Sequence, residues 1–306
     1  MSSRRSEHEY QRRLHAVVEY IDRHLGGQLD LATLASVAHF SPFHFHRLFQ
    51  ALMGEALGDY VRRRRIEFAG VRLLSHPHMP VIDIAMAVGF GSAESFSRAF
   101  RATFGMAPTQ WRKSKKGQVP SKTGKITSKR GQAVPGAYRQ HGGSSIQETS
   151  MNVMLVDRDS VHIAYYRLTG PYGPAIGRFW RETVAPWMVT NNLLGRERYG
   201  IGLDDPGVTR PERCRYDAGV VSPKGEVLSG NPHRRVIPGG RYASMSYEGT
   251  GAGLPEAWQS LLRDWLPKSG LQLDSRPFFE QYPADGYYDP KSGAFSCNLC
   301  IPVTSL

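Results

Sequence analysis

A glutamate between two aromatic residues is the most suggestive chemical feature of the sequence. Glu280 lies between Phe278 and Tyr282 in a stretch with the pattern of a β-strand. Residues two apart on a strand point to the same face, so these three side chains should lie together. A carboxylate between aromatic rings can hold an organic cation through opposite charge and through the ring quadrupoles. The same pattern also fits an exposed strand glutamate in an ordinary ion pair.

A second set of residues with chemical potential lies in an internal repeat of the first third of the chain. Ala35–Phe40 aligns with Ala85–Phe90, and Phe45–Phe49 aligns with Phe96–Phe100. Each copy reads as a short helix, a tight turn and a second helix that begins after a serine N-cap. Two helix-turn-helix copies predict a domain whose second helices enter the major groove of DNA. The rival interpretation is a plain helical bundle with a solvated, charged face.

The outward side chains of each second helix are the candidate base readers. Arginine can bond to guanine, glutamate can accept from cytosine, and an aromatic ring can touch the methyl group of thymine. The candidates are Phe43, His46, Arg47 and Gln50 in the first copy, and Ala93, Glu94, Ser95, Ser97, Arg98 and Arg101 in the second.

Three regions of different composition must position these residues. Residues 1–113 have helical periodicity, which predicts an all-α domain with two helix-turn-helix units joined by a long helix over Leu57–Ser75. Residues 114–150 are rich in Gly, Ser, Lys and Gln, which predicts a flexible basic linker. Residues 151–306 alternate apolar runs with Gly and Pro, which predicts an α+β domain.

The C-terminal region also repeats itself. Trp180 and Trp187 recur as Trp258 and Trp265, and each half has the pattern strand, helix, strand, strand. Two such units predict a pseudo-symmetric domain with a ligand cleft between them. We expect Trp187 in the core, Trp180 either in the core or in the cleft wall, and Tyr166, Tyr172 and Tyr287 as candidate wall residues.

Charge and composition narrow the class of protein. The formal net charge is +12, from 39 Lys and Arg against 27 Asp and Glu, and the excess lies almost wholly before residue 151. This asymmetry favours a polyanion partner for the first half. The three cysteines are too few for a disulfide framework, and no apolar stretch has the length of a transmembrane helix. We therefore expect a cytoplasmic protein with no membrane partner.

Metal and redox chemistry are not expected. The histidines of the first domain are not spaced as a closed metal site, and no cysteine lies near them in the sequence. Cys297 and Cys300 are three apart on an expected strand, so their sulfurs should point to opposite faces. The sequence predicts no bound metal, no cofactor and no catalytic residue.

A specific motif runs through the second helix-turn-helix and the residues after it. It consists of Ile84-Ala-x-x-x-Gly89-Phe90, Ser95-Phe96-Ser97-Arg98-x-Phe100, Phe104-Gly105, Pro108 and Trp111-Arg112. This pattern resembles the AraC/XylS transcription factors over about residues 7–113, with Ala107 and Trp111 as small departures. The resemblance implies double-stranded DNA and RNA polymerase as partners. It places base readers on Phe43, His46 and Arg47, and on Ala93, Glu94, Ser95, Ser97 and Arg98.

A looser motif covers residues 151–306. It consists of Tyr166–Tyr172 (YRLTGPY), Phe279–Tyr282 with Asp289-Pro290, and Leu299–Val303. This pattern resembles the GyrI-like effector-binding domains of bacterial regulators. The resemblance implies a cleft for a small, often cationic or aromatic molecule, with Glu280 central to its binding.

Together these features predict a transcription regulator with a DNA-binding domain and a C-terminal domain that binds a small-molecule effector. Two alternatives stay open. Some GyrI-like proteins hydrolyse reactive compounds, and Glu280 with Tyr166 or Tyr282 could act there as general base and proton donor. The C-terminal domain could instead dock a protein partner.

Overall fold

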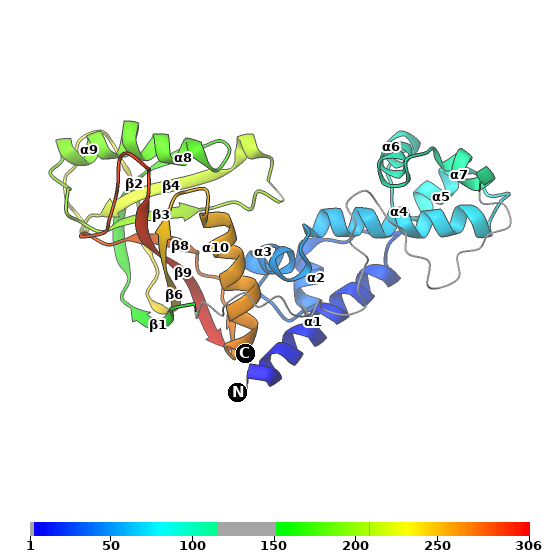
Figure 1. Cartoon of the computed structure of the whole chain (residues 1–306), viewed down its shortest axis with the longest axis horizontal. Helices are drawn as coiled ribbons and strands as arrows, with labels where there is room; N and C mark the ends of the chain where they lie inside the picture. Colours follow the sequence, from blue (N-terminus) through cyan, green and yellow to red (C-terminus); the bar gives the residue numbers. More distant parts are fainter. Residues whose placement is uncertain (1–2, 115–150, 208) are drawn as a thin grey trace. The chain divides into compact units, whose positions relative to one another are not determined.

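The computed structural model describes residues 3–114, 151–207 and 209–306 (Figure 1). The chain forms two compact units. Of the described residues, the sheet unit contains 3–10, 40–52, 151–207 and 209–306, and the helical unit contains 11–39 and 53–114. The linker predicted over 114–150 lies outside the described residues, except for Ser114. Residues 40–52, although early in the sequence, belong to the same unit as the C-terminal residues.

The helical unit packs short helices around one long helix. Its elements are the second part of α1 (Ser3–Arg23), then α2 (Leu31–Val37), α4 (Leu57–Ser75), α5 (Val81–Ala87), α6 (Ala93–Phe104) and α7 (Pro108–Ser114). One buried cluster joins α4, α5 and α6 through Ile66, Ala69, Leu73, Ile84, Ala85, Val88, Phe96 and Phe100.

The helices α5 and α6 form the second predicted helix-turn-helix. The turn between them contains Gly89, whose φ of 84° lies in the left-handed region that favours glycine. A Cβ at this position would lie 2.7 Å from the carbonyl oxygen of Leu25. The helix α6 then begins because the Ser92 hydroxyl accepts a hydrogen bond from the Ser95 N–H at 3.1 Å. The predicted all-α, helix-turn-helix fold of the N-terminal region is confirmed.

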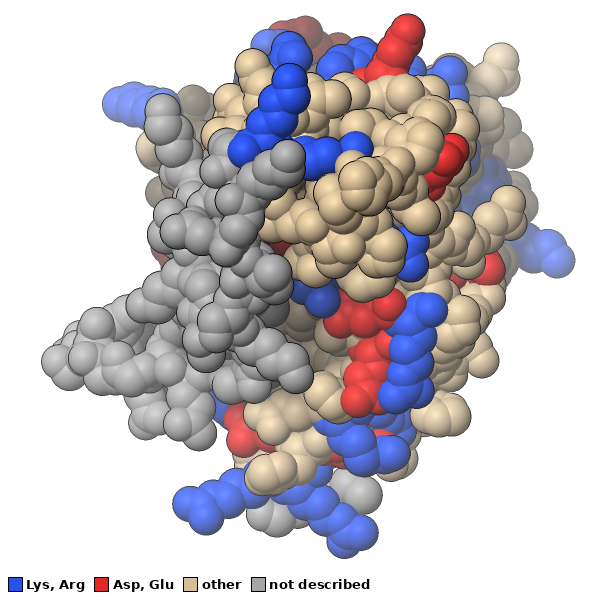
Figure 2. Space-filling view, turned by 90° about the vertical axis from the view of Figure 1, so that its right-hand side faces the viewer, with Lys and Arg blue, Asp and Glu red and all other residues tan. Residues whose placement is uncertain are grey.

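The four consecutive arginines of α4 are all bonded within the helical unit. Arg65 donates to the carbonyl oxygens of Leu25, Gly27 and Gly89 at 2.8–2.9 Å and so ties three backbone segments together. The other three form ion pairs: Arg62 with Asp59, Arg63 with Glu55 and Glu67, and Arg64 with Asp22 and Glu67. Figure 2 likewise shows basic side chains beside acidic ones over the middle of the visible face.

The sheet unit is built on an antiparallel sheet with internal symmetry. Across the sheet the strands follow the order β1-β6-β9-β8-β3-β4-β2-β5, and β7 pairs with β9. Exchanging β1, β2, β3 and β4 with β5, β6, β8 and β9, respectively, gives the same order read from the other end of the sheet. The predicted duplication and the α+β class are therefore confirmed. The strands are β1 (Val153–Arg158), β2 (Val161–Thr169), β3 (Arg198–Gly202), β4 (Arg215–Val221), β5 (His233–Ile237), β6 (Gly240–Gly249), β7 (Leu271–Leu273), β8 (Phe279–Tyr282) and β9 (Phe295–Ser305).

Each half of the sheet unit carries a helix with a π-helical turn. The first half has α8 (Pro174–Phe179), η1 (Trp180–Val184) and α9 (Ala185–Thr190), and the second has α10 (Leu254–Ser260), η3 (Leu261–Trp265) and η4 (Leu266–Lys268). A short 3-10 helix, η2 (Pro211–Arg213), precedes β4. The helices α8 and α9 lie across one face of the sheet, where Val184 and Trp187 pack on Ala218 (Figure 1). A second core, with Tyr199 and Phe279, lies on the other face.

Two N-terminal segments complete the sheet unit. The start of α1 is attached to the C-terminal region, because the Tyr10 hydroxyl donates to the Leu271 carbonyl at 2.7 Å and the Gly270 N–H donates to the Ser6 hydroxyl at 3.2 Å. The other segment is most of α3 (Pro42–Met53), the second helix of the first predicted helix-turn-helix. No helix within the described residues is long and apolar enough to cross a membrane.

The bonds of Arg65 predict a difference between neighbouring arginines. Arg65→Lys leaves partly buried carbonyl oxygens without a donor and should lower the free energy of unfolding by about 1–3 kcal/mol. Arg62→Lys changes only an exposed ion pair and should shift it by less than about 0.5 kcal/mol. Urea unfolding followed by helical circular dichroism measures both. Equal effects would show that the three carbonyl bonds do not stabilise the helical unit.

Candidate functional site

Antiparallel pairing places four residues in one row across the sheet. Glu280 of β8 pairs with Gly200 of β3, Gly200 pairs with Ala218 of β4, and Ala218 pairs with Tyr166 of β2. Directly paired residues share a face of the sheet. The row therefore lies on the face covered by α8 and α9, where Ala218 is part of the buried core.

Because Gly200 has no side chain, side chains from two strands that are not neighbours can meet above it. Tyr216 of β4 reaches over β3 and donates from its hydroxyl to Glu280 Oε2 on β8 at 2.7 Å. A Cβ at position 200 would overlap both the Tyr216 hydroxyl and the Glu280 carboxylate. Glycine at this position is thus required by the close approach of two side chains rather than by backbone conformation.

Glu280 is a buried carboxylate whose hydrogen-bond donors are neutral. Its side chain is only 9% exposed. Besides Tyr216, the Tyr282 hydroxyl donates to Oε2 at 2.8 Å, and the Trp258 side chain on α10 lies beside the carboxylate. These neighbours bring no positive charge to the carboxylate.

The surroundings shift the pKa values of the carboxyl group and of both hydroxyl groups. Burial raises the pKa of Glu280, and the hydrogen bonds from Tyr216, Tyr282 and Trp258 oppose that rise without cancelling it. Burial, together with the charge of Glu280, raises the pKa values of Tyr216 and Tyr282 well above the ordinary range. Both tyrosines therefore stay protonated and act as donors near neutral pH.

Aromatic rings surround this carboxylate. Trp180 donates from Nε1 to the Tyr216 hydroxyl at 3.3 Å, and its ring meets the ring of Tyr282 edge-on at 5.6 Å between centroids. Trp180 and Trp258 occupy corresponding positions in the two halves, and both lie at the same hydrogen-bonded group. The group of Trp180, Tyr216, Trp258, Glu280 and Tyr282 is called the glutamate site below.

The other predicted ligand residues lie at different distances from the glutamate site. Phe278 precedes β8, and its ring stacks on Trp258 at 5.8 Å. The Tyr172 ring meets Tyr216 edge-on at 6.3 Å, while its hydroxyl donates to the Arg215 carbonyl. Tyr166 is separate: its hydroxyl donates to the Gly230 carbonyl, and its ring packs on Trp187 at 5.2 Å.

Sequence reasoning did not assign Tyr216, Trp258 or Gly200 to the site. A signal existed for Trp258, because the repeat relates it to Trp180, which was a candidate. Tyr216 and Gly200 come from strands whose order in the sheet the sequence does not give.

On α6 of the helical unit, the predicted base readers differ in exposure. Glu94 and Arg98 are exposed, whereas Ala93, Ser95 and Ser97 are half-buried. The Ser95 hydroxyl donates to the Ser92 carbonyl at 2.9 Å and so takes part in the helix cap. Arg101, the remaining candidate, is exposed as well, so Glu94, Arg98 and Arg101 are the candidate base readers of α6 that solvent reaches most freely.

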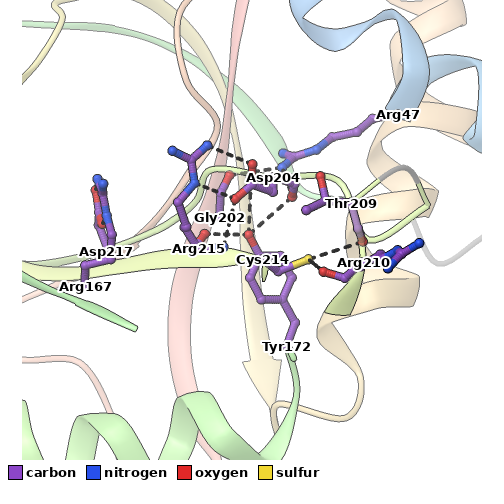
Figure 3. Close-up of polar contacts among 10 residues, drawn as sticks. All are labelled: Arg47, Arg167, Tyr172, Gly202, Asp204, Thr209, Arg210, Cys214, Arg215 and Asp217. Atoms are coloured by element: carbon purple, nitrogen blue, oxygen red, sulfur yellow. Dashed lines mark hydrogen bonds and ion pairs between the residues drawn. The ribbon is translucent and has the colours of Figure 1, made fainter. Parts of the chain in front are cut away.

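The predicted base readers on α3 contact residues 202–207 of the same unit, and Figure 3 shows this contact for Arg47. Arg47 donates to the carbonyl oxygens of Gly202 and Asp204, both at 3.0 Å. His46 is 7% exposed, and its Nδ1 donates to Asp205 Oδ2 at 3.0 Å. Gln50 is half-buried beside Gly207. For Phe43 the structure describes the backbone only.

No group of three or more His, Cys, Asp or Glu side chains within the described ranges is arranged to hold a metal ion. His44 and His46, in particular, have partners of other kinds. His44 Nε2 donates to the Arg276 carbonyl at 2.7 Å, and His46 bonds to Asp205.

Comparisons with known proteins assign both regions to a class. Residues 34–114 match a family model described as a helix-turn-helix domain, and residues 151–304 match one described as the GyrI-like small molecule binding domain. Together they define a DNA-binding regulator with a small-molecule-binding domain. Since the second match covers half of the chain, the protein belongs to the GyrI-like family, here joined to an AraC-type helix-turn-helix domain.

The chain is similar to several known proteins over different lengths. The chain is 25% identical to the "Right origin-binding protein" of Escherichia coli strain K12, over 93% of this chain and 95% of that protein. It is 33% identical to the "Regulatory protein SoxS" of Salmonella typhimurium, over 34% of this chain and 95% of that protein. A solved transcriptional regulator of the AraC type from Chromobacterium violaceum is 25% identical, over 35% of this chain and 95% of that chain, with a TM-score of 0.33.

The buried carboxyl group predicts how stability depends on pH. Because the pKa of Glu280 is raised in the folded protein, the folded state holds a proton that the unfolded chain releases above about pH 4.5. The free energy of unfolding should therefore fall as pH rises through the interval above 4.5. Glu280→Gln cannot titrate and should escape that part of the fall. Urea unfolding of both proteins from pH 4.5 to 7.5 should show a stability difference that grows in favour of the variant. A constant difference would contradict the raised pKa.

Proposed function

We propose that the protein regulates transcription in response to an organic cation that binds at Glu280. A buried carboxylate with neutral donors only is the observation that carries this proposal. Taking a carboxylate out of water without a counter-charge is unfavourable. A cation supplies the missing charge, and the rings of Trp180, Trp258 and Tyr282 supply apolar contact and ring quadrupoles.

The chemistry of the site indicates the class of ligand. Small hydrophilic cations gain little from a site lined by four aromatic rings, whereas a lipophilic, aromatic cation gains from both the rings and the charge. Because Glu280 is enclosed, such a ligand must displace at least one of the rings that cover it. Trp258 is suited to move, since it covers the carboxylate from a helix rather than from the sheet.

The two helix-turn-helix copies are proposed to bind double-stranded DNA. Glu94 and Arg98 of α6 would contact base edges, with Ala93, Ser95 and Ser97 beside them. On α3 the corresponding residues are Phe43, His46, Arg47 and Gln50, once the helix is free of its contacts to residues 202–207. RNA polymerase is the proposed partner in activation, and the cytoplasm is the proposed compartment, where a regulator meets its DNA.

The same residues also fit a hydrolase. Glu280 with its raised pKa could act as a general base and Tyr282 as a donor, since the two are hydrogen-bonded. Tyr166, the other donor considered, lies apart from the carboxylate and bonds to Gly230. If the protein consumes the ligand and Glu280→Gln abolishes that reaction, the hydrolase becomes the better hypothesis than the sensor.

Cation binding can be tested on the full chain with tetraphenylphosphonium. We expect micromolar affinity, about −8 kcal/mol, measured by calorimetry. Glu280→Gln keeps the shape, removes the charge and should weaken binding at least tenfold, because a charged hydrogen-bonding partner contributes ~1.5–3 kcal/mol. Neutral triphenylphosphine oxide should bind the two proteins equally.

A matched control is Glu197→Gln, which removes one negative charge elsewhere in the sheet unit. Glu197 bonds to Gln281, the residue that faces away from the glutamate site, so this variant should bind the cation as the unchanged protein does. If both variants weaken binding equally, the effect is one of overall charge and the site lies elsewhere. If neither variant weakens cation binding, docking of a protein partner becomes the better hypothesis for the C-terminal domain.

Sequence-specific DNA binding can be tested at Arg98. Arg98→Ala should lose about 1–3 kcal/mol on a DNA site selected from a random pool, with little change on random DNA. Fluorescence anisotropy measures both affinities. Arg62→Ala, which removes an ion-paired arginine of the same unit, serves as the control. An equal loss on selected and random DNA would assign Arg98 to a phosphate contact. Arg47 is unsuitable for this test, because it also bonds to the carbonyl oxygens of Gly202 and Asp204 in its own unit.

A further inference from the structure

We propose that residues 202–207 and Phe278 hold α3 in a state that excludes DNA. The loop uses the donors that a recognition helix would offer to DNA. Arg47 donates to two carbonyl oxygens and His46 donates to a carboxylate. Guanine edges and phosphates present acceptors of the same kind, so the loop and DNA compete for the same side chains.

The burial of His46 also prevents DNA from reaching α3. His46 is 7% exposed, and Asp205 beside it is also largely covered. A recognition helix must place its side chains against base edges in the groove. That approach is closed at His46 while the loop is in place, so the two states of α3 exclude one another.

The loop is fixed in the shape that accepts α3. The Tyr172 hydroxyl bonds to both the N–H and the carbonyl of Asp204, at 3.1 and 3.2 Å (Figure 3). The Asp204 carboxylate accepts three bonds from Arg215 at 2.8–2.9 Å. Asp205 accepts from the Gly207 N–H at 2.8 Å as well as from His46. The acceptors are therefore in position before α3 arrives, which lowers the entropy cost of holding it.

The electrostatics of the loop favour the contact. Hydrogen bonds from Arg215 hold the pKa of Asp204 below its ordinary range. Burial acts to raise the pKa of Asp205, but the bonds from His46 and from the Gly207 N–H outweigh it, and the pKa is lowered. Both carboxyl groups are ionised near neutral pH, so the loop is negatively charged where α3 presents Arg47 and His46.

Phe278 links this contact to the glutamate site. One side of its ring stacks on His44 of α3, with centroids 4.0 Å apart and planes 16° apart, and the Arg47 guanidinium lies 5.2 Å from its centroid. The ring of Trp258 stacks on Phe278 at 5.8 Å and 15°. Trp258 also lies beside the Glu280 carboxylate. Three contacts thus join the carboxylate to the recognition helix.

His44 behaves as a neutral ring in this stack. Burial lowers its pKa to about 4, although the bond to the Arg276 carbonyl opposes the shift. A neutral imidazole stacks on Phe278 without the cost of burying a charge. The support of α3 by Phe278 is therefore apolar and depends on the position of the Phe278 ring.

Ligand binding would weaken this support. A cation that pairs with Glu280 competes with Trp258 for the carboxylate and occupies space beside its ring. When Trp258 moves, Phe278 loses one stacking partner and α3 loses its apolar support. This coupling step rests on the proposed cation binding, whereas the competition between loop and DNA does not. A cation therefore shifts the population toward the state with α3 free.

The competition is tested without ligand, by DNA binding of the full chain. Asp205→Asn removes the charge that holds His46 and should raise affinity for a selected DNA site about fivefold or more. Asp289→Asn is the matched control: Asp289 accepts from Lys291 and Ser292 in an exposed turn of the same unit. It removes the same charge and should leave DNA affinity unchanged.

The variant Gly207→Val tests the same contact through a steric clash. A Cβ at Gly207 would lie 2.9 Å from Gln50 Oε1 and 3.1 Å from His46 Cε1, so the larger side chain of Gly207→Val should push α3 away and also raise DNA affinity. Unchanged or weaker DNA binding by Asp205→Asn, with an unchanged melting curve, would overturn the proposal even if Gly207→Val fails to fold. Equal gains by Asp205→Asn and Asp289→Asn would overturn it too, because both would report charge alone.

Tetraphenylphosphonium tests the coupling step. It should raise the DNA affinity of the unchanged protein and have a smaller effect on Asp205→Asn, which is already released. A cation that binds without changing DNA affinity would overturn the coupling and leave the proposed effector site standing. A cation that does not bind would overturn the effector site and the coupling with it, and the Asp205 result would still decide the competition.

Discussion

A carboxylate buried without a charged partner is the constraint around which the sheet unit is organised. The side chain of Glu280 is largely buried and therefore depends on hydrogen bonds from the protein. Tyr216 provides one donor only because Gly200, on the strand between them, has no side chain. Tyr282 provides the other, Trp258 lies beside the carboxylate, and Trp180 in turn donates to Tyr216. These neighbours are neutral and bring no positive charge to the carboxylate.

The same aromatic residues explain how a binding event could reach the recognition helix. Trp258 lies beside the carboxylate and contacts Phe278 through its ring, and Phe278 contacts α3. The ligand and α3 therefore depend on two neighbouring rings rather than on a long route through the sheet. If Trp258 has two positions, α3 has two positions as well. A ligand that favours one of these two states then shifts the population toward it.

Much of the fold was predictable because it follows from local patterns. The apolar spacing of Phe96 and Phe100 and the Ser92 cap specify the second helix-turn-helix, and both features are present. The repeated tryptophans indicated the duplicated α+β unit, which the symmetric strand order confirms. Alternation along the strand also indicated that Glu280 and Tyr282 share a face, and the two are hydrogen-bonded.

The rest of the candidate site depends on residues far apart in the sequence. Tyr216 reaches Glu280 because β3 lies between their strands, and the alternation within each strand does not contain that order. Helical periodicity places His46 and Arg47 on an outward face, but it does not distinguish a face that meets DNA from one that meets another part of the chain. Asp205, 159 residues away from His46, makes that difference.

Thermodynamic linkage offers the most direct measurement of this coupling. If a cation at Glu280 and DNA at α3 favour the same state, each must tighten the binding of the other by the same factor. Tetraphenylphosphonium can be titrated into the full chain, with and without saturating selected DNA, and followed by the intrinsic fluorescence of its five tryptophans, two of which line the glutamate site. The coupling predicts a dissociation constant about fivefold or more lower in the presence of DNA. The same dissociation constant with and without DNA would contradict it.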